Sequence, residues 1–599
     1  MKYHKLLGVV CLLLVMGCQQ KKSEFTENTV EKDNQELASL LKEYYEERLQ
    51  FYPLDATFSG DARYNDTLAN NISELYREKL RSFYSKYKTE LSSFNKTQLS
   101  ENDVTSYDVL LWECNINLGE LSYPTHLTPV DQFWTPQLII GQFASGASAQ
   151  PFETVKDYED WLSRVDDFVV WCDTAIMNMK KGMGTGWVLP QSLIKKVIPQ
   201  MKAWDHGVIE EHHFFSPIHL MPESFSKEDK GKLRTAYSSM VGNKIIPIFE
   251  KFTSFLENEY LPAGRETSGI SAVPDGEEFY QHRIKLYTTT DMTADEIFEL
   301  GKSEVVRIRE EMEKVKEQVG FEGDLKAFFD HVRTKPELMS FTDPQEVIDN
   351  FEAIHEKMKP ELSKQFDLVP KAAFEVRRTE AFREASASAE YNPGSLDGTR
   401  PGVFYVPIPD VKAYNVFSDE SLFLHEAIPG HHYQISLQQE NENLPDFRKT
   451  LWYSAYGEGW ALYSESLGKE LGLYDDPYQY FGALSAEMHR AIRLVVDAGM
   501  HSKGWTREEA IQYSLENEAE SEASITSEIE RYMAGPGQAL SYKIGQLKIR
   551  SLRTEAKEKL GEQFDIKIYH NIVLEPGCIP LALLEDKVND WVGSVGENL

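Results

Sequence analysis

The sequence predicts a mainly α-helical protein with one small β element. Two capping boxes, Thr293 to Glu296 and Thr506 to Glu509, place a carboxylate three residues after a threonine and indicate helix starts. After the first box, apolar residues recur at near-helical intervals: Ile297, Leu300, Val305, Ile308 and Met312. The chain has 599 residues, of which 41% are apolar, so it can bury a large core arranged as two lobes or a few fused subdomains.

One region breaks the helical pattern. Between residues 386 and 416, turn residues alternate with short apolar runs, which predicts a small β element. Because proline lacks the N–H that a central strand needs, Pro407 and Pro409 predict that the segment Val403 to Pro409 lies at a sheet edge or outside the sheet. An exposed edge can hold an extended peptide by strand addition, and Tyr405 in this segment is a candidate substrate-binding residue.

The N-terminus has the pattern of a bacterial lipoprotein signal. Lys2 and Lys5 precede an apolar run that ends just before Cys18, which predicts a signal peptide at residues 1–17 and a lipidated cysteine after it. The alternative is an ordinary signal peptide with a chance cysteine. The run is too short to span a bilayer comfortably, so we expect a lipid anchor in the bacterial cell envelope, as in a periplasmic or outer-membrane lipoprotein. Residues 18–35 are polar and predict a tether.

The net charge argues against a nucleic-acid-binding protein, and the cysteine content argues against a disulfide-stabilised one. The formal net charge of -33 repels phosphate backbones, so we expect no binding to nucleic acid. Apart from Cys18, the chain after the signal peptide has only Cys114, Cys172 and Cys578, too few and too scattered for a disulfide framework. Packing must therefore hold the core together, and the oligomeric state stays open.

The segment Ser421 to Gln434 looks like a stretched zinc-binding motif. In an ordinary HExxH motif, histidines at positions i and i+4 of one helix face bind zinc, and the glutamate polarises the bound water. His425 and Glu426 are present here, but position i+4 is Pro429. Proline removes a helical hydrogen bond and the glycine after it tolerates unusual backbone angles, so the helix can open and bring His431 back toward His425.

His432 is the rival second ligand. It lies seven residues after His425, nearly in phase on an unbroken helix but about 10 Å further along the axis. Two imidazoles would be strained in reaching one ion across that gap. We therefore expect His425 and His431 to be metal ligands, with Glu426 as the catalytic base.

Glu458 is the candidate third protein ligand. A catalytic zinc ion commonly takes a third ligand, often a glutamate, and leaves one position for water. Enough residues separate His431 from Glu458 for one helix to end and a second helix to pack alongside. Glu465, seven residues later, is either a hydrogen-bond partner of a ligand or a solvated charge.

Further candidates lie downstream. Arg531, Tyr532 and Tyr542 surround a Pro-Gly turn, and each can donate to the oxygen that becomes negative during hydrolysis. Arg531 and Tyr542 are candidate catalytic residues and Tyr532 a candidate substrate-binding residue, although aromatic residues beside a turn are as often part of the core. Asp497 and His501, one helical turn apart, are either substrate-binding residues near the site or an ordinary helix pair.

Four segments of the chain resemble a large bacterial family catalogued only as domain of unknown function 885. These segments are Tyr391 to Gly402, His425 to Gln434, Glu458 to Tyr463, and Arg531 to Gly545. That family looks in turn like the helical zinc peptidases of the HExxH superclan. The chain departs from those peptidases in the longer spacing before the second histidine.

The resemblance implies both a fold and an activity. The fold would be a two-lobed helical zinc-peptidase-like fold with a deep channel, with a helical lobe at residues 36–290 and a catalytic helical lobe at residues 291–599 that carries the small β element. The activity would be zinc-dependent hydrolysis of peptide bonds in short peptides, with Zn²⁺ as cofactor. The alternatives are a zinc hydrolase of esters or other amides, and a non-catalytic lipoprotein that binds peptides.

Overall fold

The computed structural model describes residues 34–133, 135–380, 384, 388–396, 398 and 400–596. The predicted signal peptide, Cys18 and the predicted tether up to residue 33 lie outside these residues. The first helix, α1 (Gln35–Phe51), begins at the last residue of the predicted tether, with Asn34 as its N-cap. None of the described helices is both long and apolar enough to cross a membrane.

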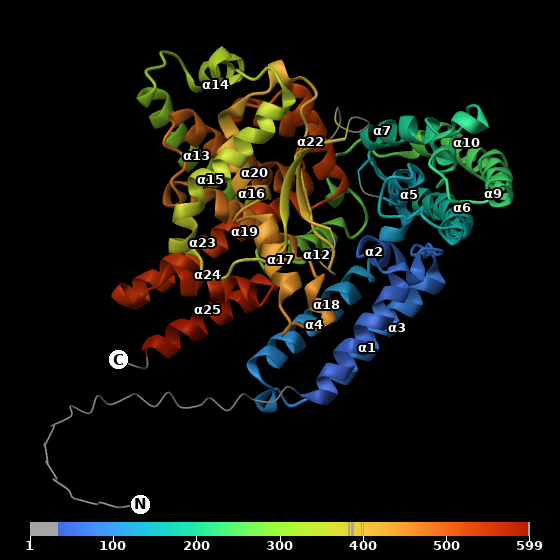
Figure 1. Ribbon diagram of the computed structural model, residues 1–599, viewed down its shortest axis with the longest axis horizontal. Helices are drawn as coiled ribbons and strands as arrows, with labels where there is room; N and C mark the ends of the chain where they lie inside the picture. Colours follow the sequence, from blue (N-terminus) through green and yellow to red (C-terminus); the bar gives the residue numbers. More distant parts are fainter. Residues whose placement is uncertain are drawn as a thin grey trace, which may run out of the picture.

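The fold is mainly α-helical, as the sequence predicts (Figure 1). After α1 come α2 (Pro53–Phe58), α3 (Glu74–Leu91), α4 (Glu101–Glu120), α5 (Pro136–Ala144), α6 (Val155–Thr185), α7 (Gln191–Lys202), α8 (Ser216–His219), α9 (Lys227–Met240), α10 (Ile246–Phe255) and α11 (Leu261–Ala263). The chain continues with α12 (Gly276–Thr288), α13 (Ala294–Gln318), α14 (Leu325–Thr334), α15 (Pro344–Gln365), β1 (Phe374–Arg378), β2 (Glu390–Asn392) and β3 (Gly402–Val406). It ends with α16 (Asp419–Glu426), α17 (His431–Glu440), α18 (Asp446–Lys449), α19 (Ser454–Ser466), α20 (Pro477–Lys503), α21 (Arg507–Asn517), α22 (Glu522–Ala534), α23 (Ser541–Leu560), α24 (Ile566–Leu574) and α25 (Leu581–Gly596).

Both predicted capping boxes are confirmed. At the start of α13, the Thr293 hydroxyl accepts a hydrogen bond from the backbone of Glu296 at 3.2 Å, and the Glu296 carboxylate accepts one from the Thr293 backbone at 2.8 Å. Thr506 and Glu509 do the same for α21, at 3.1 and 2.8 Å. Such reciprocal bonds satisfy backbone donors that a helix start leaves without partners.

The largest apolar cluster joins the first helices to those near the C-terminus. The ring of Tyr44 in α1 packs against Phe447 in α18, with 5.6 Å between ring centroids. Tyr453, just before α19, donates a hydrogen bond of 2.8 Å to the buried Glu113 of α4. The N-terminal helices therefore belong to the same core as the helices that carry the predicted metal ligands.

A second apolar cluster lies within residues 68–260. Its helices include α5, α6, α7, α9 and α10, which gather on one side of the molecule in Figure 1. The first cluster runs across residue 290, where the sequence predicts a boundary between two lobes. That division at residues 36–290 and 291–599 stays a prediction.

Within the part of the chain that the structure describes, three strands form one small sheet in the order β1-β3-β2. β2 and β3 lie within the predicted β element, whereas β1 precedes it. The sheet-edge position predicted for the segment that contains Tyr405 is wrong, because β3 is the central strand, parallel to β1 and antiparallel to β2. Pro407 follows directly after Val406, the last residue of β3, so its missing N–H interrupts no pairing within the strand.

Two glycines allow α19 and α23 to cross in close contact. A Cβ atom on Gly545 would lie 1.8 Å from the carbonyl oxygen of Ala455, and one on Gly459 would lie 2.5 Å from the Cα of Gly545. Both distances are far below van der Waals contact, so neither position has room for a side chain. Because α19 also carries Glu458, this crossing sets the position of a predicted metal ligand.

We expect Gly545→Ala to destabilise the protein, because the methyl group would push α19 and α23 apart. Overpacking of this kind costs about 1–3 kcal/mol. Gly231→Ala is the matched control, since Gly231 lies in α9 with open space around it and the substitution should stabilise by about 0.5–1 kcal/mol. Urea unfolding of both variants tests the expectation, which is wrong if Gly545→Ala unfolds at the wild-type midpoint.

Candidate metal centre

The predicted break in the helix is present. α16 ends at Glu426 and α17 begins at His431, with four residues between them. A Cβ atom on Gly430 would lie 1.9 Å from the carbonyl oxygen of His425, so only glycine lets the backbone pass this close. The carbonyl of Pro429 accepts a hydrogen bond of 2.8 Å from the indole of Trp460, which fastens the break to α19.

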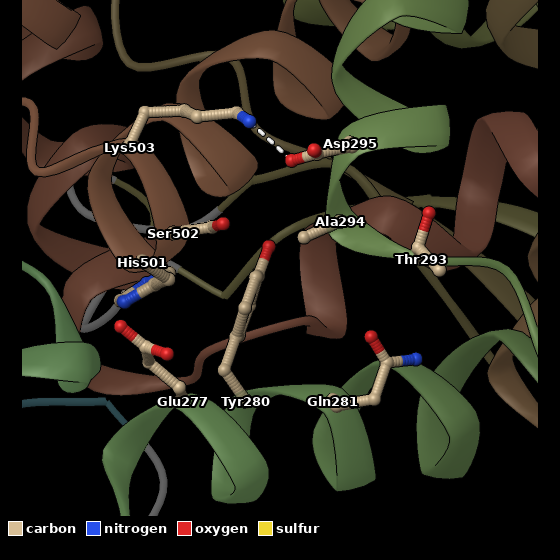
Figure 2. Close-up of a pocket in the computed structure, with 9 residues that line it drawn as sticks. All are labelled: Glu277, Tyr280, Gln281, Thr293, Ala294, Asp295, His501, Ser502 and Lys503. Atoms are coloured by element: carbon tan, nitrogen blue, oxygen red, sulfur yellow. Dashed lines mark hydrogen bonds and ion pairs between the residues drawn. The ribbon is translucent and has the colours of Figure 1, made fainter.

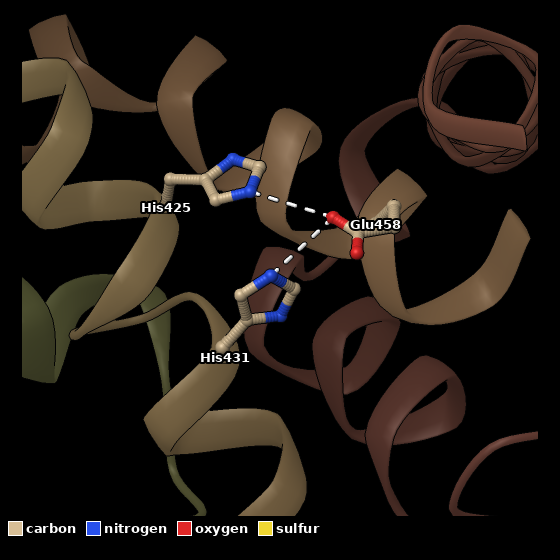
Figure 3. A group of neighbouring side chains, drawn as sticks. All are labelled: His425, His431 and Glu458. Atoms are coloured by element: carbon tan, nitrogen blue, oxygen red, sulfur yellow. Dashed lines mark ion pairs between the residues drawn. The ribbon is translucent and has the colours of Figure 1, made fainter. Parts of the chain in front are cut away.

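The break brings His431 to His425 and Glu458. One ligand atom from each of these three residues lies within 4.8 Å of the other two. The Nε2 atoms of His425 and His431 lie 3.5 and 3.4 Å from the same Glu458 oxygen, and both imidazoles point toward that carboxylate in Figure 3. Two imidazole nitrogens and one carboxylate oxygen form a ligand set that suits zinc. The group can therefore hold a metal ion.

His432 points elsewhere. Its Nδ1 forms a hydrogen bond of 2.9 Å with the Tyr391 hydroxyl, and its ring packs 4.8 Å from the ring of Phe374 in β1. Burial lowers the pKa of His432 to about 4, so the ring stays neutral at pH 7. Of the two rival histidines, the structure places His431 in the cluster and His432 against the sheet.

Glu465 is a partner of His425 and not a solvated charge. Its Oε1 accepts a hydrogen bond of 2.7 Å from Nδ1 of His425, and its Oε2 accepts one of 2.9 Å from Ser421. Only 5% of Glu465 is exposed. A carboxylate bonded to one imidazole nitrogen fixes the ring and leaves the other nitrogen free to bind a metal.

The cluster concentrates negative charge around two imidazoles. Burial opposes the charged form of His425, but hydrogen bonds with Glu458 and Glu465 outweigh it and raise the pKa of His425 to about 9. The pKa of Glu458 is lowered, because the charges and hydrogen bonds of the two histidines outweigh the effect of burial. The pKa of Glu426 is raised, mainly by burial. Any metal that binds here must displace the proton from His425, so metal affinity should fall at low pH.

Tyr542 lies beside this cluster. Burial raises its pKa, and the nearby charge of Glu458 adds to the effect. The guanidinium of Arg493 lies over the Tyr542 ring, 4.5 Å from its centroid. Of the three predicted oxyanion donors, Tyr542 is therefore the one whose pKa responds to the charge of Glu458, a predicted metal ligand.

Arg531 and Tyr532 are engaged with other residues. Arg531 forms an ion pair of 2.9 Å with Glu528 and donates a hydrogen bond of 2.7 Å to Gln538. The Tyr532 hydroxyl donates to Glu528 at 2.6 Å and accepts from Arg493 at 2.9 Å. The catalytic role of Arg531 and the substrate-binding role of Tyr532 therefore stay predictions.

Asp497 is fully buried and bonded to protein groups. It accepts hydrogen bonds from the Tyr280 hydroxyl at 2.6 Å and from the backbone of Gly537 at 3.1 Å. Burial raises the pKa of Asp497 to about 7, although both bonds act in the opposite direction. Through these hydrogen bonds, Asp497 connects α20 to α12 and to the loop before α23.

His501 is also fully buried, but it borders a cavity. Its Nδ1 accepts from the backbone of Ile270 at 3.0 Å, and its Nε2 donates to the carbonyl of Tyr532 at 3.0 Å. With Tyr280 and Lys503 it lines a polar cavity of about 440 Å³ between α12, α13 and the end of α20 (Figure 2). The substrate-binding roles predicted for Asp497, His501 and, in the central strand, Tyr405 stay predictions.

Three residues near the cluster were not predicted from the sequence. The ring of Trp452 lies 5.7 Å from that of His431, and 43% of Trp452 is exposed. On α20, Arg490 lines a small cavity together with His425, and Arg493, one turn later, lies over the ring of Tyr542. The two arginines could have been found from the sequence, because they lie seven and four residues before the candidate Asp497, and residues at these spacings share a helix face.

We expect His431→Ala to lower zinc affinity by more than about 100-fold, because it removes a ligand from the cluster. His432→Ala is the matched control, since it removes the next imidazole in sequence, which is also buried but faces the sheet. Competition with a chromophoric chelator measures both affinities. Equal losses in the two variants would contradict this assignment of the second ligand.

The raised pKa of Asp497 predicts a pH-dependent stability. Because its folded-state pKa is about 7 and the unfolded value about 3.8, the folded state binds the proton more tightly. The contribution of Asp497 to the free energy of unfolding is fully present below pH 3.8 and is lost as the pH rises through 7. We expect Asp497→Asn to remove this decline, so urea unfolding at pH 5 and pH 8 should show a smaller difference in the variant than in the wild type. The same pH difference in both proteins would contradict the expectation.

Comparisons with known proteins place the chain in a family. Residues 53–588 match the model of a family described as "Bacterial protein of unknown function (DUF885)". The crystal structure of "the putative lipoprotein from Colwellia psychrerythraea" is 29% identical, with a TM-score of 0.85 over 94% of this chain and 99% of that one. The structure of "a putative lipoprotein of unknown function from Shewanella oneidensis" is 19% identical and has the same fold, with a TM-score of 0.72 over 92% of this chain and 99% of that one. No curated protein matches the chain. The chain therefore belongs to this bacterial family of unknown function.

Proposed function

We propose that the protein is a zinc-dependent peptidase that hydrolyses peptide bonds in short peptides. The observation that carries the proposal is the convergence of His425, His431 and Glu458, with their ligand atoms within 4.8 Å of one another. Glu426 directly follows the first ligand in sequence, as a catalytic base does in zinc peptidases.

The residues around the cluster fit a zinc ion. Glu465 holds the His425 ring through Nδ1, so that Nε2 faces Glu458. His425, His431 and Glu458 would hold the ion, and a zinc ion bound there would supply a polarised water molecule and a polarised substrate carbonyl near neutral pH.

The protein supplies the proton transfers. Burial raises the pKa of Glu426 toward the working range of a general base, so this carboxylate can take a proton from the attacking water and return it to the leaving amine. Tyr542 is our candidate donor to the carbonyl oxygen as negative charge develops on it, since it lies near Glu458. Arg531 is the second candidate donor, but its guanidinium already forms an ion pair with Glu528 and a hydrogen bond with Gln538.

The proposal extends to the architecture and the location. We infer two lobes around a deep channel, which would admit short unfolded peptides and exclude folded proteins. We also infer a lipid anchor at Cys18 in the bacterial cell envelope, which the signal sequence supports, as does the description of the Colwellia protein as a "putative lipoprotein".

We expect Glu426→Gln to keep zinc and to lower kcat by about 10²- to 10⁴-fold, because it removes the base but none of the proposed ligands. Glu458→Ala should lose both zinc and activity. Metal analysis of the purified proteins and cleavage of a mixed peptide library, with and without a chelator, measure these effects. If the wild type retains no zinc, or if Glu426→Gln cuts peptides at the wild-type rate, the proposed mechanism is wrong.

A further inference from the structure

A small cavity adjoins the proposed metal centre. It has a volume of about 150 Å³ and lies between α16 and α20, with His425 and Glu465 in its wall. α20 contributes Ser485, His489 and Arg490 to the same wall. Most small-molecule sites have volumes of about 300–1,000 Å³, so this cavity suits one end of a ligand and not a whole peptide.

Arg490 gives this cavity a positive charge with an unsatisfied donor. Its Nη1 donates to the carbonyl of Ala486 in its own helix at 3.2 Å, while its Nε is buried and has no partner among the residues that the structure describes. Arg493, one turn later, also has a buried nitrogen without a partner among the described residues, Nη1, but its charge is paired with Glu528 at 3.0 Å. A buried donor without a partner is costly, so the Arg490 guanidinium is suited to an acceptor that comes from outside the chain.

This face of α20 borders the metal cluster. Arg490 lines the same cavity as His425, and His425 directly precedes the proposed base, Glu426. Arg493, one turn later on α20, lies over the ring of Tyr542. The guanidinium of Arg490 therefore lies on a cavity whose wall includes a proposed metal ligand.

The carboxylates that line the cavity do not neutralise Arg490. Glu465 is bonded to His425 and Ser421, and Glu520 is exposed. His489 does not compete for an anion, because it is paired with Glu518 at 2.5 Å. Arg490 is thus the group in this wall that can bind an incoming carboxylate.

We propose that Arg490 binds the C-terminal carboxylate of the peptide substrate, so that the protein releases residues from the C-terminal end of peptides. This inference rests on the peptidase function proposed above. A guanidinium binds a carboxylate through two parallel hydrogen bonds, which fixes both the position and the orientation of the chain end. Because the cavity shares His425 with the metal centre and is small, the bond that is cut lies close to that end.

The test compares two peptides that differ only in a C-terminal carboxylate or carboxamide. Calorimetry with the zinc-loaded Glu426→Gln variant measures binding without cleavage. We expect the carboxylate peptide to bind about 10- to 100-fold more tightly than the carboxamide, in line with a charge-assisted hydrogen-bond pair. Adding Arg490→Gln should abolish the preference, whereas Arg490→Lys, which keeps the charge but loses the planar fork, should retain part of it.

Arg333→Gln, introduced in the same Glu426→Gln protein, is the matched control, because it removes an equal charge from the partly exposed surface of α14 and should leave the preference intact. Thermal unfolding of each variant checks that it is folded. Equal binding of the two peptides, or a preference that survives Arg490→Gln, overturns the inference. The wild type separates the two proposals: cleavage of both peptides alike at internal bonds leaves the peptidase function standing without this subsite. A carboxylate preference without any cleavage leaves the subsite standing without the peptidase.

Discussion

The contact between the backbone of Gly430 and the carbonyl of His425 determines the geometry on which the proposed metal centre depends. With any side chain at position 430, the chain after α16 could not turn back, and His431 would move away from His425. Trp460 then holds the break against α19 through the carbonyl of Pro429. Since α19 is itself fixed by its glycine crossing with α23, one continuous set of contacts positions the two histidines and Glu458 relative to one another.

The charges of the site follow from the same arrangement. Glu426, Glu458 and Glu465 are three largely buried carboxylates around two imidazoles. Buried carboxylates need compensating positive charge, and His425 contacts both Glu458 and Glu465. A divalent cation can provide the same compensation while His425 becomes neutral, so the protein can exchange a proton for a metal ion without leaving Glu458 and Glu465 unpaired.

Sequence reasoning was most successful where the decisive interactions are local. The capping boxes at Thr293 and Thr506 and the turn at Pro429 depend on residues a few positions apart, so the sequence carried the information. β1 was not predicted, because its pairing with β3 joins segments distant in sequence. The sheet-edge position predicted from Pro407 was wrong for a related reason. A proline is excluded from a central strand, but the sequence does not show whether the strand ends one residue before it, as β3 does at Val406. Arg490 was missed because its significance lies in the partner it lacks, which only the folded chain can show.

The packing of α1 and α4 against segments near the C-terminus has a consequence for how the protein acquires its structure. Tyr44 meets Phe447 and Glu113 meets Tyr453, and the salt bridge of Glu101 with Lys587 spans almost the whole chain. Contacts between such distant segments form late, because long loops must close before they are made. The N-terminal helices emerge from the ribosome long before their partners, so the largest core can be completed only after nearly the whole chain has been synthesised. The second apolar cluster has no such constraint, because all its residues lie between 68 and 260, so it can close while the partners of α1 and α4 are still being synthesised.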